Sequence, residues 1–391
     1  MTPIRIVLTM VEPPLPFGNA PARWYYVLLR GLVARGHRVT AYAACTNPTD
    51  ADAAHALFPS SDFDLRTFPV GTGGGLRSKL RTVRRPYSYM FNQDFQRSLR
   101  AELAKGFDVL HLEQVWSGWL GLNHVAKSVL QVQYLARIDL PGTRAMDPIR
   151  LAMTLRAEAK LIRAFANITT LSPRLSAEVA AINPTARVDT VPLGIDTSLY
   201  RFDPAPPPAR RPTVGLIGSF NWQPSLVAAE RLLTRLWPEI ARQVPGVRLQ
   251  VVGRKAKSAL LKYADVPGLE IFEDVPDPFP YFRSTDVLLY APTRGSGMKV
   301  KVLEAFAIGT PVVTNGEGVE GLPAEDGIHA GIADDDAGLI ARTVGLLRDA
   351  DRRHAYRTAA RSLVESHCGP GPTVDAIEAV HARVAGIAPR D

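Results

Sequence analysis

Cysteine is scarce in this sequence of 391 residues, which contains only Cys45 and Cys368. The two lie far apart in the chain, and neither has neighbours at the spacing of metal ligands. A disulfide framework is therefore not indicated, and a reducing compartment is expected.

Long apolar runs are also missing. No stretch approaches about 18 uninterrupted apolar residues, so no transmembrane helix is predicted. The short run at 4–10 is soon followed by Glu12 and several prolines, which indicates a first strand and not a signal peptide. A cytoplasmic location is expected, and a peripheral position on the cytoplasmic face of a membrane remains open.

Basic residues outnumber acidic ones only moderately, 46 against 38, which gives a formal net charge of +8. Such a charge suits nucleic acid, an anionic membrane or a phosphorylated small molecule. The sequence carries no zinc finger and no RNA-recognition signature, so nucleic acid is not an expected partner.

What the sequence does contain is a regular alternation of strand and helix signals. In the first half, 4–10 and 38–43 are strand-like and flank a predicted helix that ends at Gly36. Further strands are predicted at 107–112, 129–134 and 168–172, with a helix over 156–165. A strand, a helix and a second strand in this order indicate a parallel sheet.

A proline-rich stretch divides the chain. The segment 191–212 holds too many prolines for a core helix or a central strand. After it, strands are predicted at 214–217, 249–252, 287–290 and 311–314, and helices at 226–240 and 299–308. The expected fold class is α/β, with two Rossmann-like domains facing each other across a cleft. Their predicted bounds are 1–190 and 213–370, joined by a hinge and linker over 191–212 and followed by a C-terminal helix over 371–391 that can cross back to the first domain.

The most informative stretch is 294–314, which reads as a glycine loop, an amphipathic helix, a stop at Gly309 and a strand. Gly295 and Gly297 let the backbone approach a ligand closely. The helix that follows directs its unpaired amide groups and the positive end of its dipole at the same place.

Side chains near the start of that helix strengthen the case for an anion. Ser296 can cap the helix, and Lys299 and Lys301 add full positive charges. A diphosphate is the obvious ligand. Glu304 lies more than one turn inside the helix, where a carboxylate suits sugar hydroxyls. The alternative is a plain turn followed by lysines on a solvated face, because short glycine patterns are weak signals.

Residues 303–313, Leu-Glu-Ala-Phe-Ala-Ile-Gly-Thr-Pro-Val-Val, resemble the donor segment of the retaining glycosyltransferases of family four, formerly group 1. Similar matches occur at 36–40, 191–196 and 249–253, so the resemblance runs through nearly the whole chain. It implies a GT-B fold. It also implies transfer of a sugar, with retention and without a metal ion, from a UDP- or GDP-sugar to a glycan or lipid-linked saccharide.

The resemblance implies that Glu304 binds the ribose hydroxyls of the donor nucleotide. Backbone near Val275 is expected to contact the base. The residues expected at the donor site are Gly218, Ser219, Arg254, Val275, Gly295, Ser296, Gly297, Met298, Lys299, Lys301 and Glu304.

The sequence departs from the family pattern at three donor positions. Ser296 stands where relatives carry the first Glu of a pair, which contacts the transferred sugar. Ser219 and Pro224 stand where relatives commonly carry an Arg and a Lys that grip the diphosphate. Lys299 and Lys301 are the natural replacements for that charge, with Arg254 as a further one.

The first half is expected to carry the acceptor and one face of the catalytic centre. Phe17, Gly18 and Asn19 occupy the loop that admits the acceptor in relatives. In the segment 108–113, His111 matches a family histidine and Glu113 stands where a second histidine is usual. Glu113 is expected to face the cleft at the end of its strand, where it would orient the acceptor hydroxyl or stabilise charge on the sugar ring. His111 can equally be a buried structural histidine.

A basic segment over 76–85 contains five Lys or Arg residues beside an apolar stripe. It can lie as an amphipathic helix on an anionic membrane, which would suit a lipid-linked acceptor. An ordinary solvated helix or loop is the alternative.

Two other functions fit the same donor cleft: a nucleotide-sugar epimerase and a non-catalytic sugar-nucleotide binder, the latter because of Ser296. No Asp-x-Asp motif lies where a metal-dependent transferase would carry one, since 334–336 falls in a late loop. The paired carboxylates of a glycosidase are not marked out either.

Overall fold

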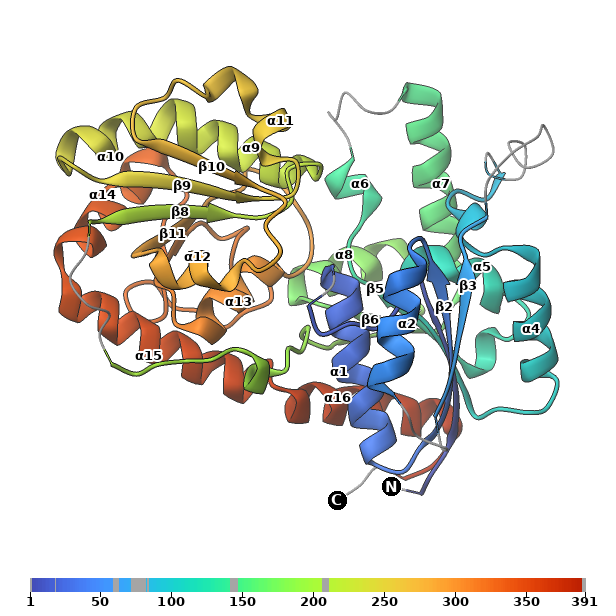
Figure 1. Ribbon diagram of the computed structural model, residues 1–391. Coiled ribbons are helices and arrows are strands. Elements are labelled where there is room, and N and C mark those ends of the chain that lie inside the picture. The colour runs from blue at the N-terminus through green and yellow to red at the C-terminus, as the bar shows by residue number, and fades with distance from the viewer. Residues whose placement is uncertain are drawn as a thin grey trace. The chain divides into compact units, whose positions relative to one another are not determined.

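The computed structural model describes residues 2–17, 19–58, 63–71, 82, 84–140, 147–205 and 211–388. It divides into two compact units: unit 1 comprises Met1–Asp196 and Gly369–Asp391, and unit 2 comprises Thr197–Cys368. Each unit has a parallel sheet with helices on its faces (Figure 1). The predicted fold class, α/β with two Rossmann-like domains, is confirmed.

The described sheet of unit 1 has seven parallel strands in the order β3-β2-β1-β4-β5-β6-β7. Their bounds are β1 Arg5–Met10, β2 Arg38–Cys45, β3 Phe63–Pro69, β4 Val109–Leu112, β5 Ser128–Val132, β6 Asn167–Thr170 and β7 Arg187–Thr190. The inner strands β1, β2, β4 and β5 are almost entirely buried, which explains their continuous apolar runs.

The helices of unit 1 are α1 Ala20–Ala34, α2 Pro48–Leu57, α4 Gln93–Leu103, α5 Gly118–Gly121, α6 Ala136–Asp139, α7 Pro148–Ala164, α8 Pro173–Ile182 and α16 Pro370–Ala385. Single 3₁₀ turns lie at Ser88–Met90, Val115–Ser117 and Val125–Lys127. Several helices begin with a side-chain cap: Asn92, Asp147 and Ser172 each accept a hydrogen bond from an amide of the first turn.

The last helix of the chain, α16, belongs to unit 1 and lies beside α1 (red and blue in Figure 1). Glu378 of α16 pairs with Arg35 and places Oε1 3.0 Å from His37 Nε2. Gly31 of α1 faces Val374, and a side chain at this glycine would collide with it. These contacts make α16 part of the packing of unit 1.

The described sheet of unit 2 has six parallel strands in the order β10-β9-β8-β11-β12-β13. Their bounds are β8 Thr213–Ile217, β9 Arg248–Gly253, β10 Leu269–Glu273, β11 Val287–Tyr290, β12 Val312–Thr314 and β13 Gly331–Ile332. The helices are α9 Gln223–Arg231, α10 Trp237–Gln243, α11 Ala256–Ala259, α12 Phe279–Ser284, α13 Val300–Ile308, α14 Asp336–Arg348 and α15 Ala350–His367. Two 3₁₀ turns lie at Thr197–Leu199 and Leu261–Tyr263.

The single helix predicted over 226–240 is interrupted in the structure. A π-helical turn at Leu232–Leu236 separates α9 from α10. Pro238 follows it in the first turn of α10 and has no amide hydrogen for the preceding turn, so the regular ladder of hydrogen bonds cannot continue there.

Of the proline-rich connection, the structure describes 191–205 and 211–212. Leu193 and Ile195 are buried in unit 1. From Thr197 onwards the chain belongs to unit 2, where Arg361 donates to the carbonyl oxygens of Thr197 and Tyr200 at 3.2 and 2.9 Å.

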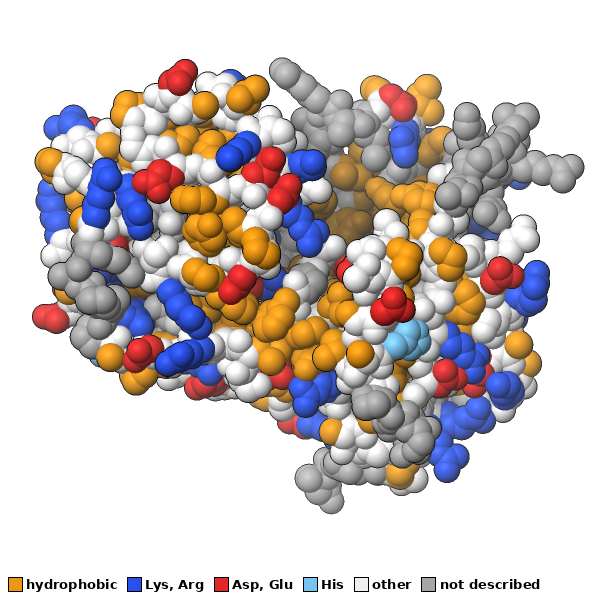
Figure 2. All heavy atoms as spheres, viewed as in Figure 1, with side chains coloured by type: hydrophobic (Ala, Val, Ile, Leu, Met, Phe, Trp, Pro, Cys, Tyr) orange, Lys and Arg blue, Asp and Glu red, His pale blue; other side chains and the backbone are white. Residues whose placement is uncertain are grey.

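None of the described helices combines the length and apolarity that crossing a bilayer requires. On the face shown in Figure 2, Lys and Arg side chains are interspersed with Asp and Glu. On this face the positive net charge is therefore spread out and not collected in one patch.

Candidate functional site

The loops that carry the predicted donor residues follow the carboxyl ends of β8, β9 and β11, at one edge of the unit-2 sheet. The first two loops touch. Gly253 has φ +146°, and a side chain there would collide with the carbonyl of Gly218. The amide of Phe220 donates to the Arg254 carbonyl at 2.9 Å. Gly253 thus allows an approach of the two backbones that a residue with a side chain would prevent.

Lys301 of α13 reaches the loop after β8. A β-carbon added to Gly218 would lie 2.8 Å from Lys301 Nζ. The ammonium donates to Ser225 Oγ at 2.6 Å and lies 4.1 Å from the centroid of the Tyr290 ring. Burial, together with the smaller effect of the neighbouring charge of Lys299, lowers the pKa of Lys301 to about 7.

Lys299 immediately precedes α13, and its side chain is only 10% exposed. Its ammonium donates to the Gly297 carbonyl and lies 3.5 Å from Glu320 Oε2. A β-carbon on Gly295, which has φ +150°, would be 3.7 Å from Lys299 Nζ. The structure therefore brings Gly218, Gly295 and both lysines together at the head of α13.

The helix predicted over 299–308 is present as α13, and it ends at Gly309, which has φ +80°. Glu304 lies on it with an exposed fraction of 6%, one turn beyond Lys301. Met298 is buried in the loop before it. The expectation that Ser296 caps the helix is wrong: Lys299 occupies the N-cap position, and its side chain makes no capping hydrogen bond.

Three other predicted donor residues, Ser219, Arg254 and Val275, lie in loops at the same sheet edge. Ser219 Oγ donates to Asn221 Oδ1 at 2.6 Å. Arg254 has an exposed side chain, and Val275 is half-buried in the loop after β10.

Three residues of this cluster were not found from the sequence: Ser225, Tyr290 and Glu320. Ser225 and Glu320 are distant from the lysines along the chain, and Tyr290 ends a predicted strand but carries no sequence signal for a ligand. Tyr290 ends β11 and Glu320 follows β12, so the rule that ligands meet the carboxyl ends of parallel strands was the signal that could have marked them.

In unit 1, Glu113 follows β4 and is fully buried. Its two carboxyl oxygens accept hydrogen bonds from Trp24 Nε1 at 2.7 Å and from Gln133 Nε2 at 3.1 Å. Burial raises the pKa of Glu113 to about 8. The expectation that the Glu113 side chain faces an open cleft is therefore wrong. The side chain is buried, and Trp24 of α1 is one of the residues that contact it.

His111, on the central strand β4, is also fully buried. Its Nδ1 lies 2.7 Å from Nε2 of His381 on α16, and its Nε2 lies 3.3 Å from Glu113 Oε1. Burial lowers the pKa of His111 to about 3, so one neutral imidazole donates to the other. This placement fits the alternative of a structural histidine that holds α16 to the sheet.

The predicted acceptor loop precedes α1. Phe17 is 50% exposed, and Asn19 Nδ2 donates to Glu12 Oε2 at 2.9 Å. Gly18 lies outside the described residues, as does most of the basic segment 76–85. Of that segment, Arg85 is described with its guanidinium 5.6 Å from the centroid of the Trp119 ring.

Within the described ranges, no three His, Cys, Asp or Glu side chains are grouped closely enough to hold a metal ion. Positive charge at the head of α13 comes from lysine side chains.

Family models match both halves of the chain. The model described as glycosyltransferase family 4 matches residues 22–199, and the model described as glycosyl transferases group 1 matches residues 211–349. The chain is a glycosyltransferase of the GT-B type.

Solved structures resemble this glycosyltransferase over nearly its whole length. Sucrose-phosphate synthase from Thermosynechococcus elongatus has a TM-score of 0.70 at 16% identity, covering 98% of both chains. Anabaena HepE in complex with UDP and glucose has a TM-score of 0.68 at 12% identity, covering 97% of this chain and 100% of that one. WaaG, a glycosyltransferase involved in lipopolysaccharide biosynthesis, has a TM-score of 0.62 at 16% identity, covering 95% and 98%. At these identities the likeness concerns the fold. No match was found among curated protein sequences.

Proposed function

We propose that this glycosyltransferase binds a nucleoside-diphosphate sugar at the head of α13 and transfers the sugar with retention, without a metal ion. The observation that carries the proposal is the position of Lys299 and Lys301 against the glycine loops. Two ammonium groups at a helix start, where amide groups also point outwards, form a site for a doubly charged anion.

The same lysines serve the chemical step. As the bond between sugar and diphosphate breaks, negative charge grows on the leaving phosphate. Ammonium groups already in place stabilise that charge, as a divalent cation does in other transferases. Lys299 is held in place by Glu320, and Lys301 by Ser225, so neither has to be ordered at the moment of reaction.

Glu304 is proposed to accept hydrogen bonds from the ribose hydroxyls, one turn behind the lysines. Ser296 offers the sugar a single hydroxyl where a carboxylate is usual, so the donor sugar is held less firmly than in relatives.

The proton of the acceptor hydroxyl is proposed to pass to the leaving diphosphate. Glu113 is an unsuitable base near neutral pH, because burial raises its pKa to about 8 and keeps it protonated. We therefore assign Glu113 and His111 a positioning role in unit 1, where they contact α1 and α16. Phe17, Gly18 and Asn19 remain the residues proposed to admit the acceptor.

A uridine nucleotide is the favoured donor, with a guanosine nucleotide as the alternative. Anabaena HepE, of the same fold, has been crystallised with UDP and with UDP-glucose. A glycan or lipid-linked saccharide is the proposed acceptor. Since WaaG acts in lipopolysaccharide biosynthesis, a peripheral position on a membrane through 76–85 fits such an acceptor. A co-sedimentation assay with anionic vesicles at low salt tests this membrane association. A protein that stays in solution would contradict it.

Calorimetric titration with UDP-glucose, GDP-mannose and ADP-glucose in EDTA tests the donor proposal. The uridine or guanosine nucleotide should bind saturably, and Glu304→Ala should weaken that binding by about tenfold to a hundredfold through loss of hydrogen bonds to a charged group. Absence of binding to every nucleotide sugar would overturn the proposal. NMR of the product should show the same anomeric configuration as the donor. An inverted configuration would contradict retention but leave the donor proposal standing.

Donor affinity should depend on pH through Lys301. The pKa of about 7 means that this side chain is charged below pH 7 and largely neutral above it, so donor KM should rise between pH 6 and pH 8. The expected rise is about tenfold, the value of one charge-assisted contact. Initial rates across this range measure it, and Lys301→Met should have a high KM that no longer changes with pH. A wild-type KM that is flat over this range would contradict the assignment.

A further inference from the structure

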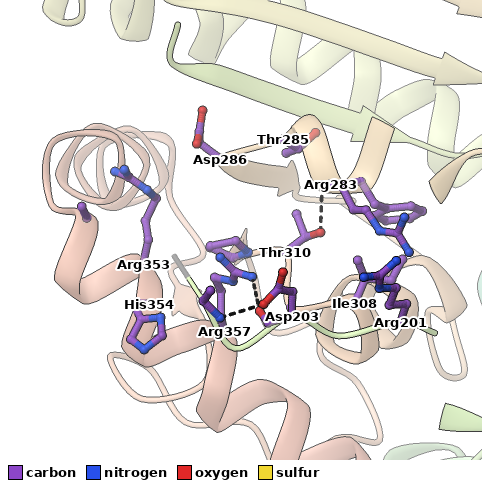
Figure 3. Close-up of a pocket in the computed structure, with 15 residues that line it drawn as sticks. Arg201, Asp203, Arg283, Thr285, Asp286, Ile308, Thr310, Arg353, His354 and Arg357 are labelled. Carbon is purple, nitrogen blue, oxygen red and sulfur yellow. Dashed lines mark hydrogen bonds between the residues drawn. The ribbon is translucent and has the colours of Figure 1, made fainter. Parts of the chain in front are cut away.

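A cavity of about 330 Å³ lies in unit 2 at the sheet edge opposite the lysine cluster. Thr285 and Asp286 precede β11, and Pro311 precedes β12, so the cavity faces the amino ends of the strands (Figure 3). Its other walls include the segment 201–205, the end of α12, the end of α13 and the first turns of α15. The proposed donor loops follow the carboxyl ends of the strands, so this cavity is a separate place.

Arginine dominates the charged lining. Arg353 and Arg357 come from one face of α15, and both are engaged: Arg357 Nη2 donates to the Asp203 carbonyl at 2.7 Å, and Arg353 Nη1 donates to the Leu347 carbonyl at 3.0 Å. Figure 3 shows Arg357 beside Asp203 in the middle of the pocket. Both guanidinium groups therefore have fixed positions at the wall.

Arg201 and Arg283 also line the cavity, and Figure 3 shows them on the same side of it. Both side chains are exposed, and neither makes a hydrogen bond or an ion pair with another residue that the structure describes. Two guanidinium groups at one pocket repel each other unless an anion lies between them.

The two carboxylates of the lining do not supply that anion. Asp286 Oδ2 accepts a hydrogen bond from the Thr213 amide at 2.9 Å, and Asp203 Oδ1 accepts one from the Ala205 amide at 2.9 Å. Both are thus used to fix local backbone, and four arginines against two aspartates leave the lining positive.

The size of the cavity indicates a small ligand. Its volume is at the lower end of the range for small-molecule sites, roughly 300–1,000 Å³. Polar groups for the uncharged part of a ligand are present: His354 Nδ1 is buried without a hydrogen-bond partner among the described residues, and His354 lines the cavity.

We propose that this cavity binds a phosphorylated small molecule, with Arg201 and Arg283 as the groups that hold the phosphate. The planar guanidinium group matches a phosphate with two parallel hydrogen bonds, which makes arginine well suited to this anion. This ligand is distinct from the sugar nucleotide, and the proposal does not depend on the identity of the donor.

Calorimetric titration with glucose 6-phosphate as the probe tests the proposal, with glucose as the unphosphorylated comparison. Wild type and Lys299→Met should bind glucose 6-phosphate saturably and with similar affinity, and neither should bind glucose. The Arg201→Ala/Arg283→Ala variant should bind the probe at least about tenfold more weakly. The control, Arg38→Ala/Arg100→Ala, removes two exposed arginines from unit 1 and should bind as wild type does.

Three results would overturn the proposal: no saturable binding by wild type, unchanged binding by the Arg201→Ala/Arg283→Ala variant, or loss of binding in Lys299→Met. The last result would place the probe at the lysine cluster. Both cavity substitutions are at exposed side chains, so thermal unfolding of the variant should match that of wild type, and a weakened titration then reports on the cavity itself.

Discussion

Replacing Lys299 and Lys301 together with methionine should lower kcat/KM for the nucleotide sugar by about a thousandfold at pH 6.5. Each lysine offers the diphosphate one charge-assisted contact, worth about tenfold to a hundredfold. Methionine keeps the unbranched apolar stem, which matters for Lys301 because its chain lies against the Tyr290 ring. Initial-rate kinetics of the two single variants and the double variant measure the losses.

The control for this experiment is Lys257→Met, which removes an exposed lysine of α11 from the same unit and should leave kcat/KM unchanged. Each single variant should cost more than about tenfold, and the two losses should be less than additive if both ammonium groups bind one phosphate. Full activity in the double variant would show that the diphosphate is held elsewhere.

The second large effect concerns stability and arises at Glu113. Its pKa in the folded protein, about 8, lies above the ordinary value of 4.5. The folded state therefore holds a proton that the unfolded chain releases, so this group's contribution is full below about pH 4.5 and is lost as pH rises to 8. The free energy of unfolding should fall by about 1.4 kcal/mol per pH unit from this cause.

His111 acts with the opposite sign and over a different range. Its folded-state pKa of about 3 lies below the ordinary 6.5, so its contribution rises with pH up to 6.5 and is then constant. Between pH 6.5 and pH 8 the contribution of His111 is constant, but Lys301, whose pKa is lowered to about 7, also titrates there. The slope due to Glu113 is therefore isolated by comparing wild type with a variant that lacks this carboxyl group.

Urea denaturation of wild type and Glu113→Gln across this window measures the effect. Relative to wild type, the variant should gain about 2 kcal/mol between pH 6.5 and pH 8, because glutamine cannot ionise. Glu102→Gln is the matched control: ion pairs with Lys105 and Arg66 lower the pKa of Glu102, so it is ionised throughout and its difference from wild type should be constant. An equally constant difference for Glu113→Gln would contradict a raised pKa.

The inner strands of both sheets could be predicted from the sequence because burial on two faces leaves continuous apolar runs. The strands β3, β7 and β10 could not, since they lie at the ends of the described sheets and have few or no fully buried residues, so they carry no continuous apolar run. The helix α13 could be predicted because its signals are local: the glycine loop, the apolar stripe and the terminating Gly309 follow one another in the sequence.

The cluster at the head of α13 was predicted to the extent that its residues are neighbours in sequence. Lys299, Lys301 and the glycine loop are found together as expected. Glu320 was not predicted, because its ion pair with Lys299 depends on how two separate loops meet. No local sequence pattern encodes such a meeting. The same holds for His381, which meets His111 from the other end of the chain. Burial of Glu113 also depends on a distant residue, Trp24.

The position of α16 has a consequence for how the protein is made. Unit 2 is one uninterrupted segment and can fold as soon as Cys368 has left the ribosome, whereas unit 1 still lacks its final helix at that moment. Until α16 has been made, the imidazole of His111 and the guanidinium of Arg35 lack the partners that α16 supplies, His381 and Glu378. Synthesis therefore completes the proposed donor half first, and the half expected to receive the acceptor is completed only after α16 has been made.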